Sequence, residues 1–493
     1  MMPIEKNEMA QILLNKFQRA KSKHDLWHNL WQDCYDYALP QRGQLSGQYS
    51  PANRRSERLY DATALDAVDQ LASLLLGNLT PPLTPWFGLK AGTELTDEEA
   101  KAIAPTLERA SQLLQAHFDQ SNFIVEVHQC FLDLVVAGTA SLCFEESTPG
   151  ELSAFQFTAI PLSDVILDEG HLGKLDIVFR NISLTLSQIL MGYDGPDIPM
   201  TILQKGNQNP DEKFELIECV LPSADGYKKT FILFSFDDNQ IIYQSELAQS
   251  PFINFRWMKS PREIYGRSPV MKTLPDIKTA NKVVELILKN ASISVTGIWQ
   301  AEDDGVLNIS NIELVPGAII PKAVGSKGLT PLEMPARFDV SQLVLEDLRS
   351  RIRHALLVDR LPQLTKSGKI TATEISVRSD EMTLLMGATF GRLQVELLNP
   401  LIQRAYAILR QRGAIPDLPL DGRIVAIDHR SPLARAQSSQ NVQNALGWVQ
   451  AATILGPEIL DQIDRPALMS YITEMLGVPD FLQNSKPHLN QGE

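Results

Sequence analysis

The sequence predicts an α+β protein that is mainly α-helical. Segments with apolar residues at helical spacing fill the first 138 residues and return after residue 270, and the longest of them covers 372–412. Between them, residues 139–258 contain short runs rich in Ile, Phe, Val and Tyr, separated by Asp, Asn, Gly and Pro, as in a mostly antiparallel sheet. With 493 residues, 44% of them hydrophobic, the chain is long enough for several domains or one elongated subunit.

Four helices are expected in the first part of the chain, each with an apolar stripe: 9–38, 62–76, about 96–118 and 122–137. Side chains suited to helix ends mark their limits, with Asp61, a Thr96–Glu99 capping box and Ser121 at starts, and Gly77 and Gly138 at ends. The Pro-rich run LTPPLTPWFGLK presents Trp86 and Phe87. We expect these two rings to pack back onto the preceding helix rather than to bind a partner.

Two helices bracket a non-helical module in the second half of the chain. The sheet, with a hairpin at Asp237–Asn239, is followed by the turn-rich segment 260–269. One helix is then expected over about 270–291 and another from Asp339 to about 358. If they are antiparallel partners, the module between them lies at their far tip, about 30 Å from the body for helices of roughly 20 residues.

A basic, glycine-containing loop precedes the longest helix. The stretch KSGKITATE at 366–374 places two lysines beside Ser-Gly and then a Thr371–Glu374 capping box, which predicts a mobile loop joined to a well-defined helix start. The helix over 372–412 is expected to kink at Pro400, to end at Gly413 and to span about 60 Å, which suits a flat or radial subunit. The remainder is expected to comprise a strand at 422–428, two helices at 437–455 and 457–476, and a disordered tail.

Charge and cysteine usage exclude some classes of protein. The net charge of −14 argues against tight, salt-dependent nucleic-acid binding over the whole surface, although it allows contact at a local basic spot. The four cysteines contain no CxxC pair and read as reduced, partly buried thiols of a cytoplasmic protein. The N-terminus lacks the apolar core of a signal peptide. The uncharged stretch 70–89 contains three prolines, so a membrane span is not expected.

Catalytic motifs are absent from the sequence. There is no GxxxxGK[ST], GxGxxG, HExxH or GxSxG, and the GSKG at 325–328 lacks the spacing of a phosphate loop. His24 and His28 lie four residues apart without a third ligand, so a solvated helix face is favoured over a metal site. No catalytic residue, metal or cofactor is therefore predicted.

Three charged segments have an ordinary and a functional interpretation. Asp237–Asp238 and the run Glu302, Asp303 and Asp304 fit solvated loops, but the second run falls on the predicted tip, where it could meet a basic partner. Lys366 and Lys369 are either simple loop lysines or brief contacts for a phosphate backbone. A metal-dependent nuclease would need carboxylates that converge from several segments, which one sequence cannot show.

Several segments, in this order, resemble the head-to-tail connecting (portal) proteins of short-tailed double-stranded DNA phages. They are the helix with Trp27 and Trp31, Tyr37–Pro40, LYDATALDAVDQLASLL, LTPPLTPWFGL, YGRSP at 265–269, TATEISVRSDEM and ELLNPLI. The likeness is spread over most of the chain and identifies a framework rather than an activity.

The resemblance implies a homo-oligomeric ring, typically of twelve subunits, at one vertex of the capsid. The terminase large subunit drives double-stranded DNA in through the ring, and the DNA later leaves by the same channel. The implied partners also include a tail adaptor and the capsid and scaffolding proteins, with assembly in the host cytoplasm and a final location in the virion. No membrane is involved. The alternatives are another head–tail ring component such as a tail adaptor, and a metal-dependent nuclease.

The resemblance also implies a division of the chain into named parts. They are a wing at 1–268 (helical over 1–138, β-rich over 139–258), a stem of two helices at 269–292 and 340–360, a clip at 293–339, a tunnel loop at 361–371, a long wing helix and strand at 372–429, a small crown at 430–480 and a disordered tail at 481–493. In this scheme Thr365, Lys366, Ser367 and Lys369 are the candidate DNA contacts of the tunnel loop. Glu302, Asp303 and Asp304 are the candidate partner contacts of the clip.

Overall fold

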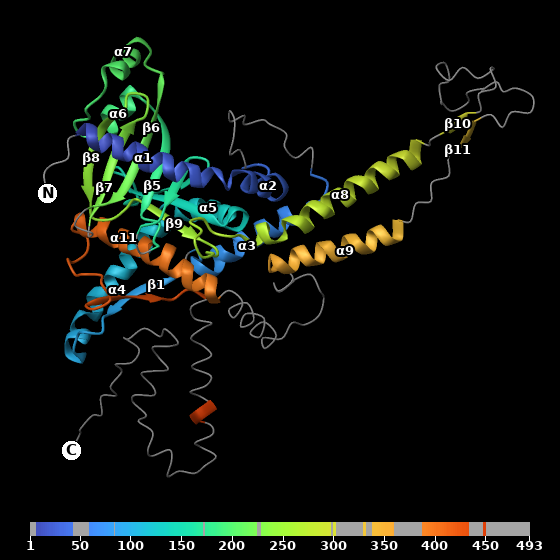
Figure 1. Ribbon diagram of the computed structural model, residues 1–493. Coiled ribbons are helices and arrows are strands. Elements are labelled where there is room, and N and C mark those ends of the chain that lie inside the picture. The colour runs from blue at the N-terminus through green and yellow to red at the C-terminus, as the bar shows by residue number, and fades with distance from the viewer. Residues whose placement is uncertain are drawn as a thin grey trace, which may run out of the picture.

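Two helices leave the body of the molecule side by side and extend to one side of it (Figure 1). The structure is a computed structural model that describes residues 6–42, 59–82, 84–170, 173–223, 228–296, 299–301, 329–331, 338–358, 387–432 and 447–449. Within these residues the body combines helices with three antiparallel sheets or strand pairs, and a fourth pair, formed by two short strands, lies beyond the two helices. The predicted mixture of helix and strand is confirmed.

Five helices form the first part of the body: α1 (Lys6–Asp25), α2 (His28–Ala38), α3 (Thr63–Leu79), α4 (Asp97–Asp119) and α5 (Phe123–Ala137). The single helix expected over 9–38 is wrong, because the chain turns at Leu26–Trp27. The Trp27 N–H bonds to the His24 carbonyl at 2.9 Å, and the helix restarts in a new direction. This break lets α1 pack on the five-stranded sheet while α2 packs on α5.

The predicted helix ends are mostly correct. Thr96 and Glu99 form a reciprocal capping box, and Gly138 closes α5 in the left-handed conformation with φ 77°. Gly77, in contrast, lies inside α3, which continues to Leu79. The N-cap of α5 is Asn122 and not Ser121, so the predicted start is one residue too early, although Ser121 Oγ does accept from the Phe123 N–H at 3.2 Å.

The strands are β1 (Phe87–Ala91), β2 (Thr139–Glu146), β3 (Phe155–Ile160), β4 (Val165–Asp168), β5 (Ile177–Thr185), β6 (Lys213–Pro222), β7 (Lys229–Ser235), β8 (Gln240–Leu247), β9 (Phe252–Arg256), β10 (Trp299–Ala301), β11 (Leu329–Pro331) and β12 (Val425–His429). Strands β4 to β8 form an antiparallel meander in chain order, β2 is flanked by β3 and β9, and β1 pairs with the distant β12. The predicted sheet and its hairpin are confirmed, with Asn239 at φ 49° in the β7–β8 turn. Two short helices between β5 and β6, α6 (Leu186–Gly192) and α7 (Met200–Gln208), were not predicted.

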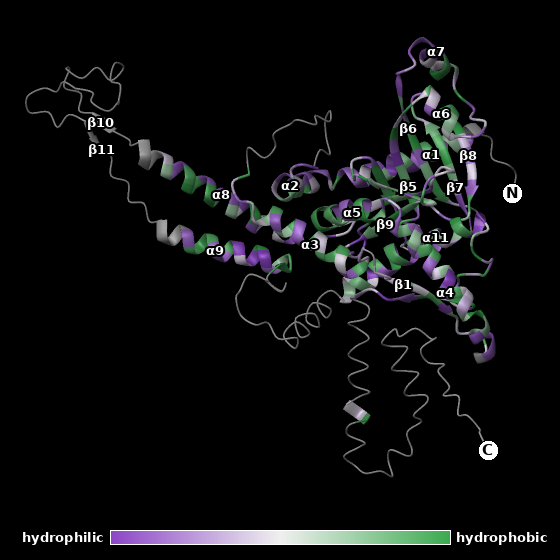
Figure 2. Cartoon of the chain, turned by 180° about the vertical axis from the view of Figure 1, so that it is seen from behind, coloured by the Kyte–Doolittle hydropathy of each residue, from purple (hydrophilic) through white to green (hydrophobic). Residues whose placement is uncertain are grey.

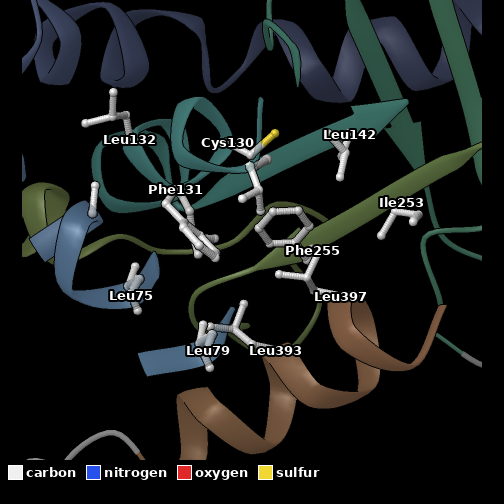
Figure 3. Close-up of a cluster of buried hydrophobic side chains, with 14 of the residues drawn as sticks. Leu75, Leu79, Cys130, Phe131, Leu132, Leu142, Ile253, Phe255, Leu393 and Leu397 are labelled. Atoms are coloured by element: carbon white, nitrogen blue, oxygen red, sulfur yellow. The ribbon is translucent and has the colours of Figure 1, made fainter. Parts of the chain in front are cut away.

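The hydrophobic core lies where α3, α5, β2 and β9 meet the long C-terminal helix (Figure 3). Phe131 of α5 and Phe255 of β9 are fully buried there, beside Leu393 and Leu397. A second cluster joins α1 to one side of the five-stranded sheet, with the Phe17 and Phe179 rings 5.6 Å apart, and a third lies under α6 and α7. The sheet is therefore covered on both faces.

Trp86 and Phe87 belong to the main core, as the packing interpretation predicted. Both rings are buried, and Trp86 lies 5.5 Å from Phe118 and 6.2 Å from Phe123, centroid to centroid. Their partners are therefore α4 and the start of α5, rather than the helix that precedes them. Phe87 also begins β1, whose pairing with β12 anchors the far end of the chain to this region.

The projecting helices are α8 (Pro269–Thr296) and α9 (Phe338–Ala355). Helix α8 is longer than predicted and reaches about 42 Å at 1.5 Å per residue, so the first residues of the module expected over 293–339 are helical. Beyond the two helices, β10 and β11 pair antiparallel. This pairing brings the outgoing and returning segments together, as expected if the two helices are antiparallel partners.

The long helix continues from residue 387 through a π-helical turn, Gln394–Leu398, into α11 (Asn399–Gln411). This π-helical turn directly precedes Pro400, which has no N–H to donate to the preceding turn and whose ring crowds the backbone there. The kink expected at Pro400 stays a prediction. Gly413 ends the helix with φ 70°, as predicted. The expected helix residues 372–386, most of the segments expected over 437–476 and the tail lie outside the described residues.

Candidate functional site at the base of the projecting helices

The YGRSP segment joins the sheet to α8 through backbone contacts that exclude side chains. Gly266 N–H donates to Thr139 Oγ1 at 2.8 Å, and Ser268 Oγ donates to the Val136 carbonyl at 2.8 Å while accepting from the Met271 N–H at the start of α8. A Cβ on Gly266 would lie 2.1 Å from the Gly138 carbonyl oxygen. The two backbone segments cross so closely that Gly138 and Gly266 must both be glycine.

Tyr265 fills the space beside this crossing. Its hydroxyl accepts from the Leu167 N–H at 3.0 Å, and its ring meets Trp31 at 4.9 Å and His24 at 5.8 Å, centroid to centroid. Burial raises the pKa of the Tyr265 hydroxyl, so it stays protonated and neutral. Arg267, the next side chain of the segment that points outward, covers the Trp27 ring. The joint is thus held by aromatic packing on one side and by backbone hydrogen bonds on the other.

The start of α3 ties both projecting helices to the body. Asn281 of α8 accepts from the N–H groups of Tyr60 and Asp61 at 2.6 and 3.1 Å. Asp61 is 5% exposed and pairs with Arg349 of α9 at 2.8 Å. Tyr60 and Asp61 together contact both α8 and α9, so this short segment fixes the spacing of the two helices at their base.

A buried arginine holds the π-helical turn of the long helix. Arg256 at the end of β9 is 2% exposed and donates to both carboxylate oxygens of Glu396, at 2.6 and 3.2 Å. It also pairs with Glu169, which Lys259 contacts in turn. Because a buried carboxylate and a buried guanidinium each require a partner, this network fixes the π-helical turn of the long helix against the sheet.

The distal part of the projection has a different surface. Beyond the base, α8 exposes Leu286 and Leu288, and α9 exposes Leu343 (75% exposed) and Val344. Hydrophobic residues continue along both helices beyond the body (Figure 2). A set of exposed leucines on a two-helix projection is the composition of an unpartnered interface rather than of a solvated surface.

The charges of the projection are slightly basic and locally paired. The two helices carry seven lysines and arginines against five aspartates and glutamates. Lys282 and Lys289 both bond to Glu285, and Arg351 bonds to Asp347. The negative charge of the whole chain is therefore not carried by these helices.

The described residues contain no group of three or more His, Cys, Asp or Glu side chains that could hold a metal ion. His24 is not on a solvated helix face, as the sequence suggested. It is buried, and its Nε2 lies 3.0 Å from the Leu162 carbonyl oxygen. All four cysteines are free and buried, and burial raises the pKa of the Cys34 thiol to about 12. No helix among the described segments is both long and apolar enough to span a membrane.

The site residues predicted from the sequence all lie outside the described residues: Thr365, Lys366, Ser367, Lys369, Glu302, Asp303 and Asp304. What the structure does place are their supports, namely the two projecting helices and the π-helical turn. Sequence reasoning missed Asp61–Arg349 and Arg256–Glu396. An arginine in the otherwise apolar strand FINFR was the available signal for the second pair, since a buried arginine requires a carboxylate partner.

Comparison with known proteins identifies a family that this chain matches over most of its length. The family model described as bacteriophage head to tail connecting protein matches residues 10–482. Similar proteins include the probable portal protein of Bordetella phage BPP-1, 23% identical over 95% of this chain and 87% of that protein, and the portal protein of Salmonella phage epsilon15, 23% identical over 94% and 87%. The portal protein of Escherichia phage T7 is 22% identical over 82% of this chain and 75% of its own length.

The match to the family model covers both the body and the projecting helices. The chain therefore belongs to the family of bacteriophage head to tail connecting proteins, and its function is that of a portal protein of the virion.

Proposed function

We propose that copies of this chain close into a ring, with twelve as the expected number, and that double-stranded DNA passes through the ring during packaging and ejection. The observation that carries the proposal is the projection. Helices α8 and α9 are fixed to the body at their base, and they expose leucines beyond it. In a ring these leucines would be covered by the same helices of the neighbouring subunits, which is the ordinary fate of a large exposed apolar patch.

The projecting helices correspond to the stem in this proposal. The module over 293–339 at their tip is then the clip, 361–371 the tunnel loop, and about 430–480 a small crown. Helices α8 and α9 support this division, because they extend away from the body side by side and the short strands β10 and β11 pair beyond them (Figure 1). The clip would meet the terminase large subunit during packaging and a tail adaptor afterwards, with Glu302, Asp303 and Asp304 available to a basic partner.

A channel for DNA must bind its cargo weakly. Lys282, Lys289 and Arg351 of the projection are each paired with a carboxylate of their own helix, which lowers their capacity to hold phosphates. An acidic lining would serve this purpose by repelling the phosphates. The slight excess of basic residues on α8 and α9 does not supply such a lining, so weak binding would come instead from pairing each cation with a neighbouring carboxylate.

The tunnel-loop lysines are proposed to touch the DNA backbone briefly. Replacing Lys366 and Lys369 by alanine is expected to reduce retention of packaged DNA without loss of the ring, since the loop is not part of the base contacts. Virions assembled with the double variant should then lose DNA faster than wild-type virions on dilution into low salt. Unchanged retention would mean that the loop is only a spacer.

The ring itself is tested by negative-stain microscopy of the purified chain. A toroidal particle with a central channel supports the portal assignment, and its rotational symmetry gives the subunit number. Cleavage of duplex DNA by the same sample in the presence of Mg²⁺ would instead support the nuclease alternative. A small ring lacking the two-helix projection would favour a tail adaptor. Capsid and scaffolding proteins are the remaining proposed partners, with assembly in the host cytoplasm.

A further inference from the structure

The five-stranded sheet has one sealed edge and one open edge. At the β4 edge, the Tyr265 hydroxyl bonds to both the N–H and the carbonyl of Leu167, at 3.0 and 3.4 Å. A strand that approached β4 would have to displace a buried aromatic side chain. Further pairing at this edge is therefore blocked by the same residue that fixes the joint with α8.

The opposite edge is β8, and within the described part of the chain only its first half is occupied. The Asp197 N–H bonds to the Ile242 carbonyl at 2.7 Å, next to the register irregularity at Leu233 and Phe234 of β7. From Gln244 to Leu247 the pairing with β7 is regular, and no backbone hydrogen bond from the other described residues reaches the outer side of this segment. Alternate backbone groups of an edge strand point outward, so this half presents unpaired donors and acceptors.

A groove runs along this open edge. Its volume is about 480 Å³, and it lies between β8 and the segment that joins α6 to α7. Its described lining includes three carboxylates, Asp194, Asp197 and Glu246, and no lysine, arginine or histidine. Lys228 pairs with Glu246 at 2.8 Å, but both side chains are more than half exposed. Met191, three residues before Asp194, is 89% exposed and adds a flexible apolar surface.

We propose that the outer edge of β8 binds an extended, lysine- or arginine-rich segment of another virion protein, which adds as a further strand to the sheet. The open backbone of Gln244–Leu247 would supply the main-chain hydrogen bonds, and the groove carboxylates would select basic side chains. The source of the segment rests on the proposed function. The groove lies at the side of the body away from the projecting helices (Figure 1), where a virion component outside the channel can reach it.

The five-stranded sheet of a second copy does not fit the open edge. Pairing of β8 with β4 of a neighbour is blocked by Tyr265. Pairing of β8 with β8 would be a two-fold contact, which a head-to-tail ring does not contain. It would also bring the carboxylates of two grooves together. The charge and the edge geometry thus favour a different chain over a copy of this one.

The probe for this proposal is a fluorescein-labelled peptide of alternating lysine and valine, titrated with the full-length chain and followed by fluorescence anisotropy. Two further peptides carry N-methyl groups, one on every lysine and the other on every valine. Strand addition uses the N–H groups of alternate residues only, so one methylated peptide should bind at least about tenfold more weakly and the other should bind nearly as well. Equal binding of all three peptides, or no binding of the parent peptide, would overturn the proposal.

The role of the groove is tested with a charge variant and a matched control. Asp194→Asn with Glu246→Gln should weaken the parent peptide about fivefold, whereas Asp69→Asn with Glu98→Gln, two exposed carboxylates on α3 and α4, should leave its affinity unchanged. Equal losses in both variants would mean non-specific charge attraction and contradict a built groove. Ring formation is scored on each sample by negative stain. Intact wild-type rings that do not bind the parent peptide refute this inference alone, and a wild-type sample that binds the peptide without forming rings refutes the proposed function alone.

Discussion

The base and the distal part of the projecting helices have opposite surroundings on the same two helices. At the base, Ile277 of α8, Ile352 of α9 and Leu356, which follows α9, are buried among the residues of the main core. Asp61 pairs there with Arg349. Further out, Leu286 and Leu343 are exposed. Amino-acid type does not distinguish the two parts, since both carry large aliphatic residues. The difference teaches that the chain packs the base by itself, whereas no other part of the described chain covers the distal leucines.

The strongest way to break the base is to separate the two crossing backbones. Gly266→Ala would place a Cβ 2.1 Å from the Gly138 carbonyl oxygen, so backbone must move. The free energy of unfolding should fall by about 3 kcal/mol or more, measured by urea denaturation at fixed protein concentration.

Gly77→Ala is the matched control, because no heavy atom lies within 4 Å of a Cβ at that position in α3. It should stabilise the chain by roughly 0.5–1 kcal/mol. A Gly266→Ala variant as stable as wild type would show that the crossing tolerates a side chain and would remove the argument for a fixed joint.

The ion pair at the base gives the next largest effect. Arg349→Met leaves the buried carboxylate of Asp61 without its guanidinium, and the expected loss is about 2 kcal/mol because Arg349 itself is partly exposed. Arg351→Met, on the same helix, removes an exposed pair with Asp347 and should change stability by no more than roughly 0.5 kcal/mol. The double variant Asp61→Asn with Arg349→Met should recover part of the loss. Equal effects of the two arginine variants would contradict a special role for the base.

The body should also lose stability in mild acid. Burial lowers the pKa of His429, whose Nε2 lies 2.9 Å from Asn399 Oδ1, and burial also lowers the pKa of His117. The unfolded chain then binds these protons more tightly than the folded chain. Stability is complete above the ordinary histidine pKa of about 6.5 and is lost as pH falls through the lowered folded values.

His429→Gln should reduce the acid-induced shift of the urea midpoint while it keeps a donor for Asn399. The comparison is made between neutral and mildly acidic buffer, with wild type and variant side by side. An unchanged shift would assign the acid sensitivity to other groups. This is the smallest of the expected effects on stability. It tests the region where β12 pairs with β1, whereas the other variants test the base of the projection.

Local patterns predicted most of the elements, because capping and periodicity act over a few residues. The Thr96–Glu99 box and Gly138 were both read correctly from sequence. Helix α6 has the same signal, a Thr185–Gln188 capping box, and could have been found by it. The break at Leu26–Trp27 gave no such signal, since apolar spacing continues across it.

Contacts between distant segments could not be predicted in the same way. The pairing of β1 with β12 and the contact of Asp61 with Arg349 join residues that are far apart in sequence, and nothing local specifies the partner. The candidate loop and tip residues were selected by charge and by their place between helices, and these features alone do not test what they touch. The projection could be predicted because connectivity alone, helix out and helix back, requires a tip.

The central claim is that the distal leucines are covered by neighbouring copies in a ring. The most direct test is mass photometry of Leu286→Ser with Leu343→Ser, beside wild type and a Leu152→Ser control at a body position that is 86% exposed. Wild type and the control should give one ring-sized mass, and the double variant should give a folded monomer with an unchanged urea midpoint for the body. A double variant that keeps the ring mass, or a wild-type chain that stays monomeric at every concentration, would contradict the account.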